Sequence, residues 1–323
     1  MSSSTRRKSA RTASQATQPA SSARRRSPSI EFVGMRRVAL APFNDPQADF
    51  VIQTQRTNTM FRVSLAILAQ ASSFFRQVES QRKQNPGLRD YEHLDVAESD
   101  ATIETILRFI YPVADPVVQD LDDVCDAYQA SVQYKFDYVA KRLREFMLSP
   151  RFMDNEPVRV YAIARRFGLA EETNIAARHV LRFPPNWPAY EEFDHISGRA
   201  YHELLTLHKN RGRKLVEFLH SFHLKEKITC MKCCPREATA ALPRRQPEWW
   251  QIYVQQATPL LLDSPANEDI FSLEFILKVA IEAGITCSMC CTSIMQAAQP
   301  GGAIAILKEG LASKPFDLVV SNT

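Results

Sequence analysis

The chain has 323 residues, of which 45% are hydrophobic and 24% are charged, a composition typical of globular proteins. This length exceeds one ordinary single-core domain, so we expect two or three domains. Only 9 glycines are present, which argues against a glycine-rich nucleotide-binding loop. We find neither an uncharged apolar run of about 18 residues nor a signal-peptide pattern, and therefore expect a soluble intracellular protein that does not enter a membrane.

Positive charge is concentrated at the beginning of the chain. Residues 1–37 contain nine basic side chains and one acid, Glu31, so they carry +8 in a chain whose total is +4. The remainder is mildly acidic and gives no support to a nucleic-acid-binding body. Residues 1–40 are poor in large apolar side chains, which predicts a disordered basic tail. The run Arg24-Arg25-Arg26-Ser27-Pro28 suits a nuclear import signal or a phosphorylation-regulated patch, a transit peptide fits by composition alone, and a solvated tail is the simplest interpretation.

Strand and helix patterns begin near residue 41. Residues 48–54 read as a strand, residues 60–63 as a second strand, and the polar residues 56–59 between them as a hairpin turn. Residues 64–76 predict a short helix that runs into a second helix, and residues 92–96 alternate like a short strand.

Helical periodicity dominates the rest of the chain. Apolar residues spaced three and four apart predict helices over 103–110, 121–128, 136–147, 160–167, 215–222 and 273–281. Gly168 is expected at the C-terminal end of the fourth of these helices, and the proline-rich residues 183–188 indicate a boundary. The predicted fold is therefore α+β, a small sheet flanked by helices followed by a mostly α-helical region. The expected division is a tail (1–40), an α/β domain (41–150), a helical extension (151–190) and a helical C-terminal region (191–323).

Residues 48–146 resemble the BTB/POZ family. The acid-aliphatic opening of that family is matched by Ala48-Asp49-Phe50-Val51. The family phrase aromatic-x-Val-His-x-x-x-Leu-x-x-x-Ser-x-x-Phe is similar to residues 61–75. A Leu-aromatic-Ile-Tyr phrase is matched within residues 106–112, and the helix that carries Ala-x-x-Tyr is matched within residues 126–134. The chain departs from the pattern at Ser64, where the family has His, and at Leu65, where many dimeric members have a basic residue. A corepressor function based on the pocket that these two positions build is therefore not expected.

Residues 156–169 resemble the start of a BACK-type helical extension, and the Tyr111-Pro112 ending is similar to the expanded BTB family of mushroom-forming fungi. The resemblance implies a protein–protein interaction module that self-associates or serves as a substrate adaptor for a cullin-type ubiquitin ligase. The expected partners are therefore a second copy of the chain and a cullin. The alternative is a nuclear, transcription-associated scaffold that uses the basic tail. Either function implies a nuclear or cytoplasmic protein.

Two cysteine clusters repeat one another, Ile228-Thr229-Cys230-Met231-Lys232-Cys233-Cys234 and Ile285-Thr286-Cys287-Ser288-Met289-Cys290-Cys291. Together they offer four thiolates for one structural zinc ion, with the ligands Cys230, Cys233, Cys287 and Cys290. The 53 residues between Cys233 and Cys287 exceed the spacing of a compact zinc ribbon, although long loops close at little extra cost.

The zinc interpretation has alternatives. Cys234 and Cys291 would not bind the metal, and His220 or His223 could replace one thiolate. Separate buried thiols, disulfides and a redox dithiol remain open, although a reducing compartment disfavours disulfides.

We find no motif for an enzyme, such as a P-loop, a nucleophile elbow or a His-Glu-x-x-His helix. His195, with its acidic neighbours Glu191, Glu192 and Asp194, and His202 and His208 are predicted on solvated faces. Of the pair Trp249-Trp250, one ring is expected in the core and the other half exposed. The sequence therefore predicts a non-enzymatic protein without a small-molecule substrate, and without base-specific contacts to nucleic acid.

Overall fold

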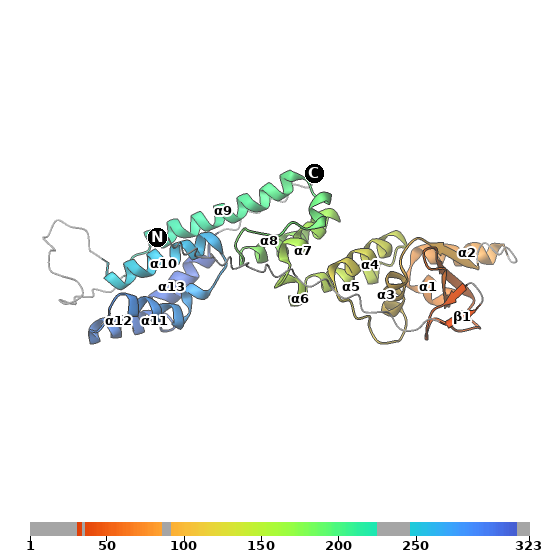
Figure 1. The fold of residues 1–323 in the computed structure, drawn as a ribbon, viewed down its shortest axis with the longest axis horizontal. Helices are drawn as coiled ribbons and strands as arrows, with labels where there is room; N and C mark the ends of the chain where they lie inside the picture. The colour runs from red at the N-terminus through yellow and green to blue at the C-terminus, as the bar shows by residue number, and fades with distance from the viewer. Residues whose placement is uncertain (1–30, 34–35, 86–91, 225–245, 315–323) are drawn as a thin grey trace, which may run out of the picture.

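The computed structural model describes residues 31–33, 36–85, 92–224 and 246–314. A small mixed sheet is followed by helices, which confirms the predicted α+β fold with a helical remainder. Figure 1 shows an elongated molecule in which the sheet and the C-terminal helices lie at opposite ends.

The sheet has five strands in the order β1-β2-β4-β3-β5. Its strands are β1 (Glu31–Val33), β2 (Arg36–Val38), β3 (Phe50–Thr54), β4 (Thr59–Val63) and β5 (His93–Val96). β3 and β4 form the predicted antiparallel hairpin, while β5 pairs with β3 and β2 pairs with β4 in parallel. Side chains of β3 and β4 alternate between buried and half-buried, as the period of a strand requires.

The sheet begins before residue 41, where the ordered region was expected to start. β1 and β2 form an antiparallel pair with Glu31 opposite Val38, and β2 adds to the sheet with Val38 opposite Met60. The basic composition of residues 1–40 concealed these strands, because each is three residues long and β2 depends on a partner distant in sequence.

Helices occupy most of the remaining described residues. Around the sheet they are α1 (Leu65–Ala71), α2 (Ser73–Gln84), α3 (Asp100–Ile110), α4 (Leu121–Gln133) and α5 (Asp137–Met147). Then follow α6 (Pro150–Met153), α7 (Pro157–Arg166), α8 (Ala170–Val180), the 3-10 turn η2 (Glu191–His195) and α9 (Gly198–Ser221). The C-terminal helices are α10 (Glu248–Asp263), η3 (Asp269–Phe271), α11 (Leu273–Glu282), α12 (Ser288–Ala298) and α13 (Ala303–Ala312).

Several helices begin at a side chain that caps their first turn. The oxygens of Ser72, Ser99, Asp120, Ser197 and Ser272 each accept a hydrogen bond from a backbone N–H three residues later. Such caps satisfy donors that the helix itself leaves unpaired. At the other end of α7, Gly168 has a φ of +69°, which confirms its predicted position after the helix.

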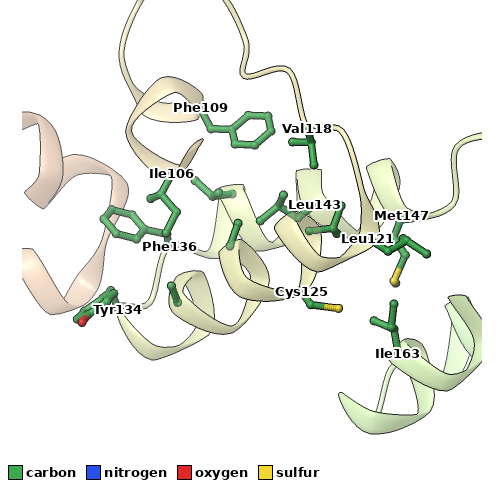
Figure 2. Packing of buried hydrophobic residues seen from close by; sticks show 14 of the residues in the cluster. Ile106, Phe109, Val118, Leu121, Cys125, Tyr134, Phe136, Leu143, Met147 and Ile163 are labelled. Atoms are coloured by element: carbon green, nitrogen blue, oxygen red, sulfur yellow. The ribbon is translucent and has the colours of Figure 1, made fainter. Parts of the chain in front are cut away.

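The buried apolar side chains form two cores. The first extends from Ala39 to Leu207 and the second from Leu215 to Leu311; we call the corresponding parts the first body and the C-terminal bundle. Figure 2 shows the first core continuing from α4 and α5 into α7, where Ile163 lies beside Cys125 and Met147. The domain boundaries at residues 150 and 190 stay predictions, and the change from one core to the other falls within α9.

α9 contributes to both cores and approaches α10 closely at Gly212. A Cβ atom at this position would lie 2.9 Å from the backbone oxygen of Leu261 and 3.2 Å from the Cα of Leu262. Glycine is therefore required here for contact between the two helices.

Ion pairs of Arg159, of which the pair with Glu192 is largely buried, join helices of the first body. Arg159 of α7 binds Glu192 of η2 at 2.6 Å, Glu156 at 3.1 Å and Asp122 of α4 at 2.5 Å. Burial alone would lower the pKa of Arg159, but its hydrogen bonds to Glu192 and Glu156 raise it above its ordinary value. The expectation that Glu192 is solvated was therefore wrong, since Arg159 compensates for its burial.

Two further predictions about exposure were wrong. Both Trp249 and Trp250 are buried, because Trp250 stacks on Tyr253 at 5.0 Å while Trp249 meets Trp250 edge to face at 5.7 Å. His208 is also fully buried, and its Nε2 lies 3.0 Å from the carbonyl oxygen of Phe183. His202 is exposed, as predicted.

Candidate protein-interaction surfaces

The residues that carry the family resemblance build the start of α1. The carboxylate of Asp49 accepts a hydrogen bond from the backbone N–H of Leu65 at 3.0 Å, and the Tyr111 hydroxyl accepts one from that of Ser64 at 2.7 Å. Leu65 itself is buried, so it presents no side chain to a partner. These contacts give the acidic opening and the tyrosine phrase a structural role.

A carboxylate and three threonines fix the β3–β4 turn to α3. Thr54 and Thr57 donate to Oδ1 of Asp100 at 2.6 and 2.5 Å, and Thr59 donates to Oδ2 at 2.8 Å. Asp100 is also the first residue of α3, where its negative charge interacts favourably with the positive end of the helix dipole. The network therefore holds the hairpin and α3 in one rigid arrangement.

A polar cavity of about 270 Å³ lies beside this network. Its wall includes Arg56 from the hairpin turn, Glu98 and Ser99 before α3, and Asp126 and Gln129 of α4. Burial raises the pKa of Asp126 above its ordinary value, and the charge of Asp122 adds to this effect. Such a mixture of donors and acceptors suits hydrogen bonds to polar side chains of a protein partner.

Exposed apolar side chains lie next to α4 and α5. Val117, before α4, is 82% exposed, Val132 in the last turn of α4 is 55% exposed, and Tyr138 at the start of α5 is 59% exposed; we call these three exposed positions together the α4–α5 surface. The segment before α4 is held against α5 by an ion pair between Asp115 and Arg142 at 3.7 Å. Tyr138 precedes Arg142 by four residues and therefore lies on the same face of α5.

The other side of α5 is anchored in the first core. Val139, Leu143 and Met147 are buried there, in contact with the same core as α3 and α4 (Figure 2). The α4–α5 surface is thus presented by rigid elements, and tyrosine, which it exposes at position 138, is enriched among the residues that dominate binding at protein interfaces.

The structure describes only part of the predicted zinc site. Cys287 caps the N-terminus of α12, and the backbone N–H of Cys290 donates to its Sγ at 3.5 Å. Cys290 is buried and Cys291 is exposed. Cys230, Cys233 and Cys234 lie outside the described residues, so the shared zinc site stays a prediction.

The candidate substitutes for a zinc ligand make other contacts. Nε2 of His220 lies 3.2 Å from the hydroxyl of Thr258, and Nδ1 of His223 lies 2.7 Å from the carbonyl oxygen of Ser221. Within the described ranges, no group of three or more His, Cys, Asp or Glu side chains is placed to hold a metal ion. Among the helices that the structure describes, none is both long and apolar enough to cross a membrane.

The five-stranded sheet and its flanking helices form one α+β domain. Residues 42–150 match the model of the BTB/POZ domain family. The chain therefore contains a BTB/POZ domain, which is a protein–protein interaction module and not a catalytic domain. A comparison of the chain with curated proteins found no match.

Sequence reasoning found the domain but missed the contacts that fix its elements and the helices that follow it. The Asp100 network carries a weak signal, a run of threonines at 54, 57 and 59 next to a predicted turn. The binding of Arg159 to Glu192 carries none, because it joins helices separated by more than thirty residues. The α4–α5 surface could not be predicted from the sequence either, since periodicity does not distinguish an apolar side chain in the core from one at its edge.

Proposed function

We propose that the protein is a recruiting adaptor, in which the BTB/POZ domain self-associates or binds a cullin-type ubiquitin ligase and the helical remainder binds another protein. The single observation that carries this proposal is the α4–α5 surface, where apolar side chains are exposed on a rigid support. Burying a side chain of this size at an interface contributes about 1.5–3 kcal/mol. Tyr138 is the anchor we expect to matter most, because tyrosine is enriched among residues that dominate binding.

The test is binding of the full chain to the N-terminal region of a BTB-binding cullin, measured by calorimetry. The full chain is required because a fragment that begins at residue 41 lacks β1 and β2. We expect a dissociation constant near or below about 1 μM, or about −8 kcal/mol. Tyr138→Glu should weaken binding at least tenfold by placing a charge in the interface.

Ile281→Glu is the matched control, since it makes the same apolar-to-acid change at an 80% exposed position of the C-terminal bundle. Absence of cullin binding by the folded wild-type protein would exclude the ligase role. The oligomeric state of wild type and of Tyr138→Glu, measured by analytical ultracentrifugation, then tests self-association at the same surface.

The basic tail favours a second candidate, a nuclear transcription-associated scaffold. Its support is the +8 charge of residues 1–37 in a chain whose remainder is acidic. Binding to unrelated DNAs that weakens with salt and disappears when residues 1–30 are deleted would support this role. A preference for one DNA sequence would contradict it.

The BACK-like extension, the fungal subfamily and a nuclear or cytoplasmic location are parts of this proposal. Buried residues of α7 and α8 belong to the same core as the BTB/POZ domain, so these helices continue the domain beyond residue 150. This packing supports the proposed extension.

A structural zinc ion in the C-terminal region is a further part of the proposal. Cys287 and Cys290 lie in one turn at the start of α12, a spacing that suits two ligands of one tetrahedral zinc. We expect purified protein to contain about one zinc per chain, and Cys230→Ser to remove it and to lower the melting temperature. Equal stability without zinc in either protein would contradict the site.

A further inference from the structure

A cavity of about 260 Å³ opens where the first body meets the C-terminal bundle. Its walls come from the end of α8, from α9, from the end of α10 with the segment that follows it, and from α13. The backbone N–H of Ala266 donates to the carbonyl oxygen of Leu181 at 2.9 Å, which joins the two parts at this point. We call this cavity the junction cleft.

The inner wall of the junction cleft is apolar. Leu181, Leu215, Leu261 and Leu311 line it, and each is at most 5% exposed. The volume is below the roughly 300–1,000 Å³ of a typical small-molecule site. It suits one large side chain with a neighbouring polar group better than it suits a cofactor.

The rim of the junction cleft is cationic. Among the described residues that line it, Arg178, Arg211 and Lys308 carry positive charge and Glu268 carries a negative charge. Arg211 is held in place by hydrogen bonds to the carbonyl oxygens of Leu311 at 3.2 Å and Lys314 at 2.8 Å. Its charge is therefore fixed at the opening.

Lys308 can change its partner at little cost. It binds Glu268 at 2.7 Å, but the two side chains are 47% and 70% exposed. Exposed pairs of this kind contribute about 0–1 kcal/mol to stability. A carboxylate from outside can therefore replace Glu268 without a large loss.

We infer that the junction cleft binds a segment of a partner protein in which a large apolar residue lies next to Asp or Glu. The apolar side chain enters the cleft, and the acidic group accepts hydrogen bonds from the rim, which are stronger than those between neutral groups because both partners are charged. This inference rests on the proposed function, because it assigns the chemistry of the protein that the adaptor recruits. A segment bound here contacts both the first body and the C-terminal bundle.

The experiment measures binding of the full chain to an array of nine-residue peptides at about 0.15 M salt, where long-range attraction is screened. The peptides place Asp or Glu beside Leu or Phe, at every position of a Gly/Ser background. Matched peptides carry Lys in place of the acid or Ser in place of the apolar residue. We expect binding to the acidic–apolar peptides alone, and an at least tenfold loss with the double variant Arg178→Glu/Lys308→Glu.

Two further variants separate the cleft from general charge. Arg213→Glu makes the same change at an exposed position of α9 outside the cleft, and should leave binding unaltered. Ala312→Trp fills the opening without changing the charge, and should also weaken binding at least tenfold. All variants retain the basic tail, so a difference between them belongs to the cleft.

Three results would overturn the inference. They are no binding to any peptide, equal binding to the Lys-substituted peptides, and no effect of either cleft variant whose circular dichroism matches wild type. Cullin binding by the same proteins distinguishes this failure from that of the proposed function. Retained cullin binding without peptide binding rejects the cleft alone, whereas peptide binding without cullin binding rejects the ligase role alone.

Discussion

Helices of the first body are joined by buried charges in addition to aromatic contacts, whereas aromatic rings join helices of the C-terminal bundle. In the first body, Arg159 links α7 with η2 and α4, and Arg144 of α5 binds Glu172 of α8, which is 4% exposed. In the bundle, Phe222 at the end of α9 contacts Trp250 of α10 at 5.7 Å, and Tyr253 of α10 meets Phe275 of α11 edge to face at 5.4 Å. Buried charges require one relative orientation of the helices, while apolar packing tolerates small shifts.

The two regions also differ in what they leave exposed. The bundle presents Leu273, Leu277 and Ile281 at intervals of four residues along α11, with exposed fractions of 54%, 45% and 80%. Among the described residues, the first body exposes fewer large apolar side chains, which are Leu40, Val117, Val132, Tyr138 and Ile175. A rigid first body with a small apolar surface fits a specific interface, and an apolar-packed bundle fits a more adaptable one.

The largest effect is expected from Trp250→Ala, which should unfold the bundle while the first body stays folded. Truncating a buried aromatic side chain costs about 3–5 kcal/mol, and this ring stacks directly on Tyr253. Hydrogen exchange should show loss of protection over residues 248–311 and unchanged protection over residues 100–147. Leu277→Ala, at a 45% exposed position, is the control and should cost less than about 1 kcal/mol. Loss of protection in both regions would show that the two cores unfold as one unit.

Arg159→Ala should give the next largest effect, and it should destabilise the first body rather than the C-terminal bundle. Removing Arg159 leaves Glu192, which is 5% exposed, without its compensating charge, at a cost of about 3–5 kcal/mol. Urea unfolding of the first body measures this loss. Glu192→Gln in the Arg159→Ala background should restore part of it, because no buried charge then remains.

Arg142→Ala is the control for Arg159→Ala. It breaks exposed pairs with Asp115 and Glu145 and should cost less than about 1 kcal/mol. An equal cost for the two arginines would remove the distinction between buried and exposed charge in the first body.

The same comparison explains how much the sequence predicted. Period-2 and helical patterns located β3, β4, β5, the helices α1 to α5, α7 and α11, and the last turns of α9, since these elements are amphipathic and their signals are local. The patterns also identified the BTB/POZ domain. They did not predict α8, α10, α12 and α13. They misplaced Trp250, His208 and Glu192, because burial of a polar or amphipathic side chain depends on a partner elsewhere in the chain. The junction cleft combines residues from four separated helices, so spacing could not reveal it.

His208 lies in α9 at the end of the first core, so it tests the stability of the molecule at the point where the two regions meet. Since the Phe183 oxygen can only accept, Nε2 of His208 carries the proton and Nδ1 does not. Within the described residues, the buried atoms Nδ1 of His208 and Nε1 of Trp187 have no hydrogen-bond partner, and the two rings lie 6.0 Å apart. Burial lowers the pKa of His208 below its ordinary value, because a second proton would place a charge in this apolar site.

The pH dependence follows from that shift. The unfolded chain binds a proton at His208 near pH 6.5, while the folded chain resists it until a lower pH. The stabilising effect is therefore complete above that value and is lost as the pH falls below it, by at most about 1.4 kcal/mol per pH unit. His208→Gln keeps a donor for Phe183 but does not titrate, so its stability should decrease less than that of wild type between pH 7 and 5. His202→Gln, at an exposed position of the same helix, should follow wild type. Parallel curves for wild type and His208→Gln would show that protonation of His208 does not limit the stability of the junction.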